Sequence, residues 1–361
     1  MNKNNQAVVY CEGAFNTPNG KTAHGLVRFT NRYRVVAVVD SRYTNQDAGE
    51  VLDGRKNHIP IFASVKDALS DRKINSGNPR YFVIGVAPDG GRMNPEIKKD
   101  IHQAIRANLD IHSGLHDYLT DDIEIVNLAK KHGVQLLDIR KPPERSELHF
   151  FSGKIEQVKA LKVAVLGTDS AIGKRTSAWI LTEALNKKGY KTEFIGTGQT
   201  AWMQGARYGL MLDAIVNDFL TGEIEHAVWK AWHETKPDII VVEGQGSLMN
   251  PAYPGGYEIL AAARPDLVIL QHAPARKEYD GFPGYPIHPL PKQIQAIELI
   301  SGKPVIAITI NHENLNDKQL SKEIHRIEDT TGLPAFDLLK NGAEALSLLV
   351  IAEIKNWLKS D

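Results

Sequence analysis

The sequence has little cysteine and no long apolar segment, and each absence excludes a class of protein. Among its 361 residues Cys11 is the single cysteine, so neither an internal disulfide nor a cysteine-based zinc cluster can form. This usage favours a reducing compartment. No apolar run approaches the ~20 residues that a membrane-spanning helix needs. The opening residues, MNKNNQAVVYCEG, lack the long apolar core of a signal peptide. We therefore expect a cytoplasmic protein.

The sequence also lacks a net charge of either sign. Forty-three Lys and Arg residues balance 43 Asp and Glu residues, so there is no general electrostatic reason to bind nucleic acid or an anionic membrane. Hydrophobic residues make up 42% of the chain and charged residues 24%, values that exclude wholesale disorder. The length exceeds the usual size of one compact domain, so two domains are expected.

Short apolar runs alternate with longer amphipathic stretches, the pattern of an α/β protein with mostly parallel sheets. Strands are predicted near 7–11, 34–40, 81–86, 109–113 and 135–138, with helices at 95–107 and 122–132. A second series of strands is predicted near 162–166, 192–196, 239–243, 267–271 and 305–310, with a closing helix at 343–358. The stretch 140–152 has no clear period and contains two adjacent prolines. We therefore predict a Rossmann-like domain at 1–145, a linker at 146–158 and a second α/β domain at 159–361.

The most specific motif is a glycine-bounded loop between a strand and a helix, KVAVLGTDSAIGKRTS, which starts at Lys162. A phosphate-binding loop needs backbone N–H groups that turn inward, a helix N-terminus and a cation, here Lys174. Two details depart from the usual pattern. Five residues instead of four separate Gly167 from Gly173, and Arg175 occupies the usual place of a metal-binding Ser or Thr.

This form of the loop resembles that of dethiobiotin synthetase and its relatives, a branch of the P-loop NTPase fold. In that branch a strand ends in Glu-Gly, and the Glu helps to hold Mg²⁺ beside the phosphates. Glu243, in VVEGQGS, stands at the matching place. The alternative is that Glu243 is a strand-end carboxylate that caps the following turn.

Motifs in both halves resemble those of a two-domain bacterial family, some members of which are described as D-glutamate N-acetyltransferases. In the first half these motifs are KTAHGLVRF from Lys21, DAGEVLDG from Asp47, VIGVAPDGG from Val83 and SGLHDYL from Ser113. In the second half they are GTDSAIGKRT, IGTGQTAWM from Ile195, EGQGSLMNPAY from Glu243, QHAPAR from Gln271 and GYPIHPL from Gly284. The resemblance covers nearly the whole chain. It implies acetyl-CoA as donor and an acidic amino acid, D-glutamate, as acceptor.

For the acetyltransferase function that the resemblance implies, roles can be assigned to individual residues. The phosphates of CoA are assigned to Thr168, Asp169, Ser170, Gly173, Lys174, Arg175 and Thr176. Asn311 follows a strand at the place where related P-loop enzymes read adenine. Arg276 is a candidate ligand for a substrate carboxylate; the alternative is a surface arginine. Glu243 and His272, each at the end of a predicted strand, are the candidate bases that accept the proton of the attacking amine. For His272 the alternative is a structural hydrogen-bonding residue.

Several alternatives remain open on the sequence alone. An ATP-dependent ligase or kinase of the dethiobiotin-synthetase type would use the same loop and Glu243, and a non-catalytic nucleotide sensor would use the loop alone. No metal ligand is assigned, because Arg175 replaces the hydroxyl; Mg²⁺ is allowed but not expected to be essential, although Thr176 could reach a metal if the helix start shifts. Asp40 ends a strand, but the first turn lacks GxGxxG, which argues against NAD. A homo-oligomer, with a dimer favoured, is expected.

Overall fold

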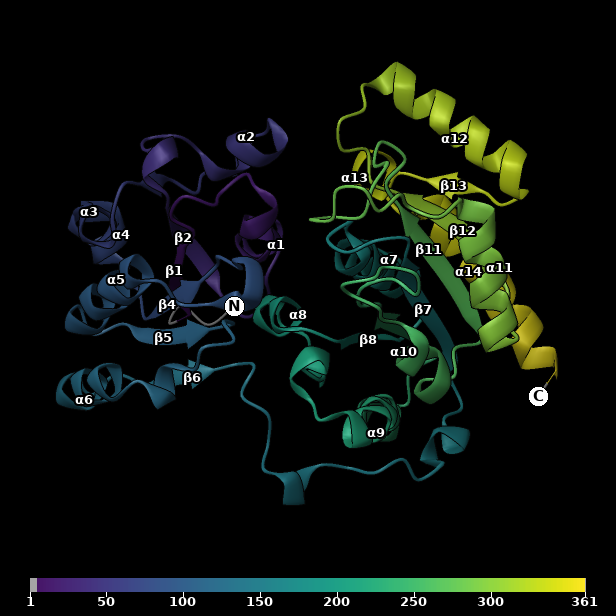
Figure 1. The fold of residues 1–361 in the computed structure, drawn as a ribbon, viewed down its shortest axis with the longest axis horizontal. Coiled ribbons are helices and arrows are strands. Elements are labelled where there is room, and N and C mark those ends of the chain that lie inside the picture. The colour runs from purple at the N-terminus through teal and green to yellow at the C-terminus, as the bar shows by residue number, and fades with distance from the viewer. Residues whose placement is uncertain (1–4, 361) are drawn as a thin grey trace. The chain divides into compact units, whose positions relative to one another are not determined.

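The computed structural model describes residues 5–360 and divides into two compact units, each built around a parallel sheet (Figure 1). The first unit comprises Met1–Pro142 together with Gln199–Gly205, and the second comprises Pro143–Gly198 and Ala206–Asp361. Within residues 5–360, no helix combines the length and the apolar character that crossing a bilayer would require.

The first sheet has the strand order β3-β2-β1-β4-β5-β6, and every neighbouring pair is parallel. Its strands are β1 (Gln6–Tyr10), β2 (Arg34–Val39), β3 (Ile61–Phe62), β4 (Tyr81–Ile84), β5 (Asp110–Ser113) and β6 (Leu136–Asp138). The helices of this unit are α1 (Lys21–Arg28), α2 (Ala48–Asp53), α3 (Val65–Ser70), α4 (Arg72–Ser76), α5 (Pro95–Arg106), α6 (Ile123–His132) and α8 (Gln199–Gln204). This is the strand order of dinucleotide-binding Rossmann folds.

The local sequence explains the helices between these strands. In α5, the side chain of Asn94 accepts the N–H of Ile97 at 2.8 Å, and Pro95 occupies the first helical position, where no N–H is needed. Ile97, Ile101 and Ile105 recur every four residues and are buried. The helix therefore packs one apolar stripe against the unit, as its sequence period predicts.

Asp40, directly after β2, occupies the place where Rossmann folds bind ribose, but its carboxylate is hydrogen-bonded to other residues of the chain. Its carboxylate is fully buried and accepts the N–H of Phe15 at 2.8 Å. The guanidinium of Arg42 donates to the same carboxylate at 2.7 and 3.0 Å. These bonds use the oxygens that a ribose hydroxyl would need, which agrees with the missing glycine fingerprint.

The second sheet is also fully parallel, with the order β13-β12-β11-β7-β10-β8-β9. Its strands are β7 (Leu161–Gly167), β8 (Thr192–Gly196), β9 (Tyr208–Gly209), β10 (Ile239–Glu243), β11 (Leu267–His272), β12 (Val305–Ile310) and β13 (Ala335–Phe336). The helices are α7 (Lys174–Lys187), α9 (Asn217–Thr235), α10 (Tyr257–Ala262), α11 (Leu290–Ser301), α12 (Asp317–Thr331), α13 (Leu338–Asn341) and α14 (Glu344–Ser360).

Helices cover both faces of this second sheet, which explains why β7 is apolar at every position after Lys162. Ala164 and Leu166 point into a core that α9, α10, α11 and α12 complete with residues such as Ile224, Ile259 and Ile294. Helix α7 packs against β7, β8 and β10, and α14 packs against α7. A central strand buried on both faces reads as a continuous apolar run instead of an alternating one.

Two features of the domain organisation differ from the predicted boundaries. Helix α8 belongs to the first unit although it follows β8 in the chain: Gln204 Nε2 donates to the carbonyls of Gly25 and Phe29 at 3.0 and 2.9 Å. The predicted linker 146–158 packs within the second unit, where Ser152 donates its N–H and hydroxyl to the buried carboxylate of Glu225 on α9 at 2.8 and 2.9 Å. Neither contact is visible in a local sequence pattern.

Candidate active site

The predicted site residues lie at the carboxyl ends of adjacent strands in the second sheet. Strand β7 leads into the loop 168–173 and then into α7, while β10 and β11 flank β7 on its two sides. Glu243 is the last residue of β10 and His272 is the last residue of β11. Parallel α/β sheets place their binding sites at this edge, so the topology brings these groups beside the loop.

The loop enters α7 through a backbone conformation that only glycine adopts without strain. Gly173 has a φ of 100° and precedes Lys174, the first residue of the helix. The side chain of Lys174 is 7% exposed, and its ammonium donates to the carbonyl oxygen of Asp169 at 2.6 Å. The cation therefore lies across the loop, beside the backbone N–H groups of the helix start, where a phosphate can take over its hydrogen bond.

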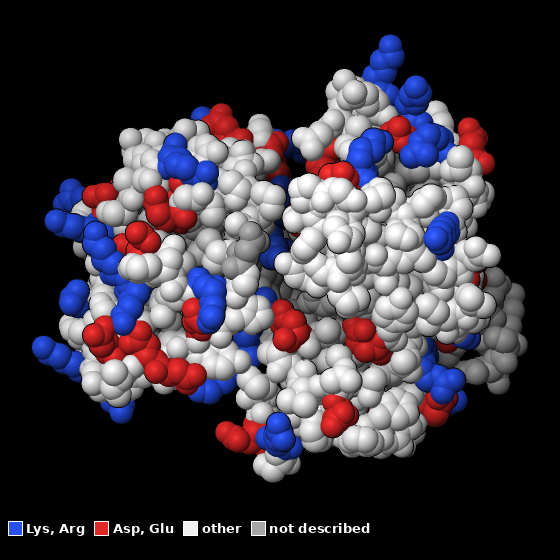
Figure 2. All heavy atoms as spheres, viewed as in Figure 1, with Lys and Arg blue, Asp and Glu red and all other residues white. Residues whose placement is uncertain are grey.

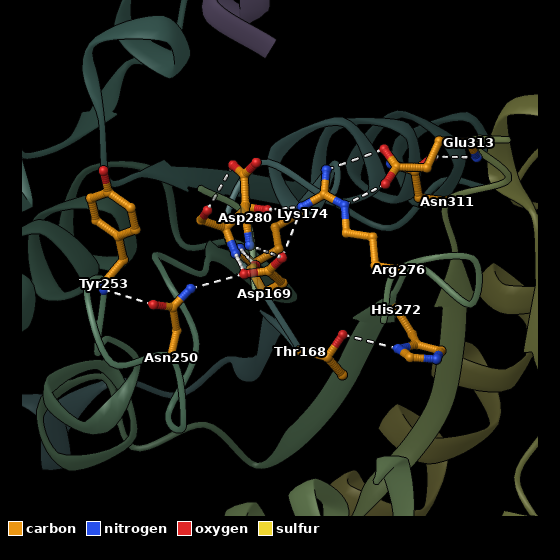
Figure 3. Close-up of polar contacts among 11 residues, drawn as sticks. Thr168, Asp169, Lys174, Asn250, Tyr253, His272, Arg276, Asp280, Asn311 and Glu313 are labelled. Atoms are coloured by element: carbon orange, nitrogen blue, oxygen red, sulfur yellow. Dashed lines mark hydrogen bonds and ion pairs between the residues drawn. The ribbon is translucent and has the colours of Figure 1, made fainter. Parts of the chain in front are cut away.

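The carboxylate of Asp169 joins three loops of the unit. It is fully buried and accepts the amide of Asn250 at 2.8 Å, the guanidinium of Arg276 at 2.9 Å, and the N–H groups of Ser170 and Asp280 at 2.7 and 3.0 Å. Figure 3 shows these groups converging on Asp169 from both sides. The carboxylate of Asp169 is surrounded by protein donors and would repel an anion, so only its backbone is suited to a phosphate; its assignment to the phosphates stays a prediction.

Arg276 bridges this carboxylate to a second one. Its Nε and Nη2 donate to Glu313, and its Nη1 also donates to the carbonyl of Ser170 at 2.9 Å. Burial alone would lower the pKa of the guanidinium, but the hydrogen bond and charge of Glu313, the hydrogen bond to Asp169 and the charge of Asp280 raise it above its ordinary value. The geometry thus favours an anchor between loops over the predicted ligand for a substrate carboxylate.

Glu243 is a buried carboxylate with cations close by. It is 5% exposed, and its Oε2 accepts the N–H of Thr197 at 2.9 Å. Burial raises the pKa of Glu243, while the charge of Arg175, the Thr197 N–H and the charge of Lys174 oppose that rise. The guanidinium of Arg175 thus supplies positive charge to the carboxylate that would help to hold Mg²⁺ in the dethiobiotin-synthetase branch.

The donor set for a metal can be examined over the whole described chain. Within residues 5–360, no group of three or more His, Cys, Asp or Glu side chains is placed to hold a metal ion. Thr176, the remaining hydroxyl candidate, lies at the third position of α7 and is partly exposed. The cationic side chains whose charges act on Glu243 are those of Arg175 and Lys174.

His272 is held in the neutral form. Its Nδ1 lies 2.9 Å from the hydroxyl of Thr168, the first residue of the loop, and both side chains are buried. Burial, and then the charge of Arg326, lowers the pKa of His272 to about 4. A neutral imidazole of such low basicity is a weak proton acceptor near pH 7, so of the two predicted bases Glu243 fits the task better.

The amide of Asn311 is occupied by a neighbour. Its Oδ1 accepts the N–H of Glu313 at 3.0 Å, and its Nδ2 donates to the Glu313 carboxylate at 3.3 Å (Figure 3). These two bonds support the anchor that Arg276 makes with Glu313. The assignment of Asn311 to adenine stays a prediction.

Sequence reasoning missed several residues that organise the site. Asn250 donates to Asp169, and Glu313 accepts from Arg276. Gln271 accepts the hydroxyls of Ser177 and Thr309, both at 2.5 Å. Gln271 is the penultimate residue of β11, and Asn250 and Glu313 lie in the loops that follow β10 and β12, after the strand ends that identified Glu243 and His272. That position could have marked them as candidates, although their partners could not have been read from it.

Comparison with known proteins places the chain in a family. Residues 149–347 match the P-loop domain, and residues 41–142 the Rossmann-like domain, of a family described as a domain of unknown function, DUF1611. The chain belongs to the DUF1611 family. A crystal structure of a DUF1611 family protein from Anabaena variabilis superposes with a TM-score of 0.87 at 29% identity, covering 97% of this chain and 100% of that one. The predicted pairing of a Rossmann-like and a P-loop domain is confirmed.

Two curated relatives carry a functional name. A protein of a Pseudoalteromonas species named D-glutamate N-acetyltransferase is 32% identical over 274 residues, which is 74% of this chain and 80% of that protein. A protein of Tritonibacter scottomollicae with the same name is 30% identical over 279 residues, with the same two shares. The family resemblance inferred from the motifs is therefore confirmed.

Proposed function

We propose that this DUF1611 protein transfers the acetyl group of acetyl-CoA to the amine of an acidic amino acid, with D-glutamate as the first candidate. The observation that carries the proposal is the similarity, over 74% of the chain, to two proteins named D-glutamate N-acetyltransferase. The phosphate-binding loop supports it, because CoA is recognised in large part through its phosphates.

The loop offers the donor a set of cations and N–H groups without requiring a metal. Lys174 and Arg175 supply two positive charges at the start of α7, next to the turn at Gly173. The hydroxyls of Thr168, Ser170 and Thr176 lie on the same segment. The phosphates of CoA carry no phosphoryl group to be transferred, so charge-assisted hydrogen bonds suffice to bind them.

The chemistry requires a neutral amine and a base to receive its proton. Glu243 is the group proposed for this, because burial raises the pKa of its carboxyl toward the range in which a base is effective near neutral pH. The amine nitrogen bonds to the thioester carbon, the carbon–sulfur bond breaks, and the proton taken by Glu243 passes to the departing CoA thiolate.

The direct test is to incubate the purified protein with acetyl-CoA and a panel of D- and L-amino acids. Release of free thiol reports transfer, and mass spectrometry identifies the N-acetyl product. We expect thiol release with D-glutamate and a much slower reaction with amino acids that lack a side-chain carboxylate. No thiol release with any acidic amino acid would refute the proposal.

An ATP-dependent ligase or kinase is the second candidate, favoured by Glu243 beside Lys174 at the place that resembles dethiobiotin synthetase. The same incubations with ATP, followed for ADP and phosphate, test it. Because Arg175 stands where such enzymes place a metal-binding hydroxyl, we expect acetyl transfer to survive exhaustive EDTA treatment. Loss of activity in EDTA that Mg²⁺ restores would favour the ATP-dependent reaction, and tight binding without any turnover would favour a nucleotide sensor.

A further inference from the structure

Three aromatic side chains gather on two loops next to the phosphate-binding loop. The rings of Tyr253 and Phe282 lie 6.2 Å apart between centroids at 71°, and those of Phe282 and Tyr285 lie 6.5 Å apart at 86°. We call these residues the aromatic trio. Tyr253 is 50% exposed and Tyr285 is 55% exposed, so this cluster offers ring surface to a ligand instead of burying it in the core.

The backbone that carries Tyr253 is fixed although its ring is exposed. Asn250 Oδ1 accepts the N–H of Tyr253 at 2.9 Å, and the carbonyl of Tyr253 accepts the N–H of Ser247 at 3.1 Å. Gly246 has a φ of 51°, and a Cβ there would lie 2.0 Å from the same carbonyl oxygen, so the loop closes on itself at a position that requires glycine. A ring held on such a backbone loses little conformational freedom when a ligand packs against it.

The second loop presents Phe282 and Tyr285 in the same way. The N–H of Tyr279 donates to the carbonyl of Tyr285 at 2.9 Å, that of Phe282 to Tyr279 at 3.0 Å, and that of Tyr285 to Phe282 at 3.2 Å. These bonds form a closed turn within residues 279–285. Its tip carries both aromatic residues, and its Asp280 lies beside the phosphate-binding loop.

Both loops are attached to the phosphate-binding loop through Asp169. Asn250 donates to Asp169 Oδ1 at 2.8 Å, the N–H of Asp280 donates to Asp169 Oδ2 at 3.0 Å, and Ser170 Oγ donates to Asp280 at 3.2 Å. Figure 3 shows Asn250 lying between Tyr253 and Asp169. In the view of Figure 2, the face of the second unit in front of α7 and α10 carries few charged side chains. Asp169, within the phosphate-binding loop, therefore holds both loops that carry the aromatic trio.

We infer that the aromatic trio stacks on the purine ring of the nucleotide whose phosphates bind at Lys174. A nucleotide joins phosphates to a flat ring, and aromatic side chains bind such a ring by stacking. The inference rests on the proposed function in that CoA is the expected nucleotide, but ATP carries the same purine. The polar edges of Asn311 are already bonded to Glu313, so stacking can hold the base without them.

The test compares a purine-containing ligand with one that lacks the purine. The full-length protein is titrated calorimetrically with CoA, with ATP and with 4′-phosphopantetheine, which keeps a phosphate but has no base. Tyr253→Ala should weaken CoA binding by about 5- to 150-fold, the range for loss of one base–aromatic stack. Tyr253→Phe, which keeps the ring, should bind CoA within about twofold of the wild type. Neither substitution should change 4′-phosphopantetheine binding.

Controls separate stacking from a general loss of structure. Phe150→Ala removes another exposed aromatic side chain of the same unit, 69% exposed and packed on Phe219 of α9, and should leave CoA binding unchanged. If Tyr253→Ala does not fold, Tyr285→Ala replaces it, with circular dichroism and Tm as the checks.

The outcomes also separate this inference from the proposed function. Unchanged CoA affinity in folded Tyr253→Ala and Tyr285→Ala, or an equal loss for CoA and 4′-phosphopantetheine, overturns the role of the trio even if acetyl transfer is observed. If the protein binds ATP but no CoA, and Tyr253→Ala weakens ATP binding, the stacking role of the aromatic trio is supported while the proposed acetyl transfer is refuted.

Discussion

Replacing the carboxylate of Glu243 by an amide is the most direct perturbation of the proposed chemistry. Glutamine has the same shape, and its carbonyl oxygen can still accept the N–H of Thr197, which lies 2.9 Å from Glu243 Oε2. The substitution removes the proton acceptor and the negative charge while keeping this hydrogen bond. A loss of activity in Glu243→Gln would therefore report on proton transfer more than on folding.

The size of the effect follows from what a general base contributes. Such a group accelerates a reaction by about 10²- to 10⁴-fold, which corresponds to about 3–5 kcal/mol of transition-state stabilisation. We expect Glu243→Gln to lower kcat by at least ~10²-fold. Because burial raises the pKa of this carboxyl, and because the base must be ionised, wild-type kcat should fall as pH is lowered through a value above that of an ordinary glutamate.

The assay is thiol release from acetyl-CoA at saturating acceptor across a range of pH, with CoA affinity measured separately. His272→Asn is the matched comparison, since His272 also ends a strand beside the loop but has a pKa lowered to about 4. Wild-type kcat in Glu243→Gln together with a collapse in His272→Asn would refute the assignment. Glu243 would then be structural or a metal ligand.

Three further predictions follow from contacts around the loop. Lys174→Ala should weaken acetyl-CoA binding by about 10- to 150-fold, since a hydrogen bond to a charged group contributes about 1.5–3 kcal/mol; equal affinity in titration calorimetry would remove the loop from the donor site. Arg276→Ala leaves the buried carboxylate of Asp169 without its cation and should lower the free energy of unfolding by about 3–5 kcal/mol, which denaturant titration measures; an unchanged midpoint would contradict the anchor role. The pKa of His272 is about 4 in the folded protein and about 6.5 when unfolded, so protons bind the unfolded state more readily, and the free energy of unfolding should fall by about 3 kcal/mol as pH is lowered from 6.5 to 4. His272→Gln should flatten this part of the curve of unfolding free energy against pH, and an unaltered curve would argue against the burial effect.

The sequence by itself determined the main strands and helices and the pairing of a Rossmann-like with a P-loop domain. The predicted strands 239–243 and 305–310 coincide with β10 and β12, and the predicted helix 95–107 ends one residue beyond α5. Such elements depend on short-range periodicity and on caps such as Asn94, which a reader of the chain can see. The phosphate-binding loop is equally local, because its glycines, its lysine and its helix start are consecutive.

The tertiary structure alone decided what the site residues contact. The ion pair between Asp169 and Arg276 joins positions 107 residues apart, and it ties Arg276, the predicted ligand of a substrate carboxylate, to the loop before α7. Helix α8 likewise packs in the first unit through hydrogen bonds from Gln204 to Gly25 and Phe29, which lie more than 170 residues earlier in the chain. Periodicity carries no information about which distant side chains meet, because that depends on the order in which parallel strands assemble and on which loops their carboxyl ends bring together.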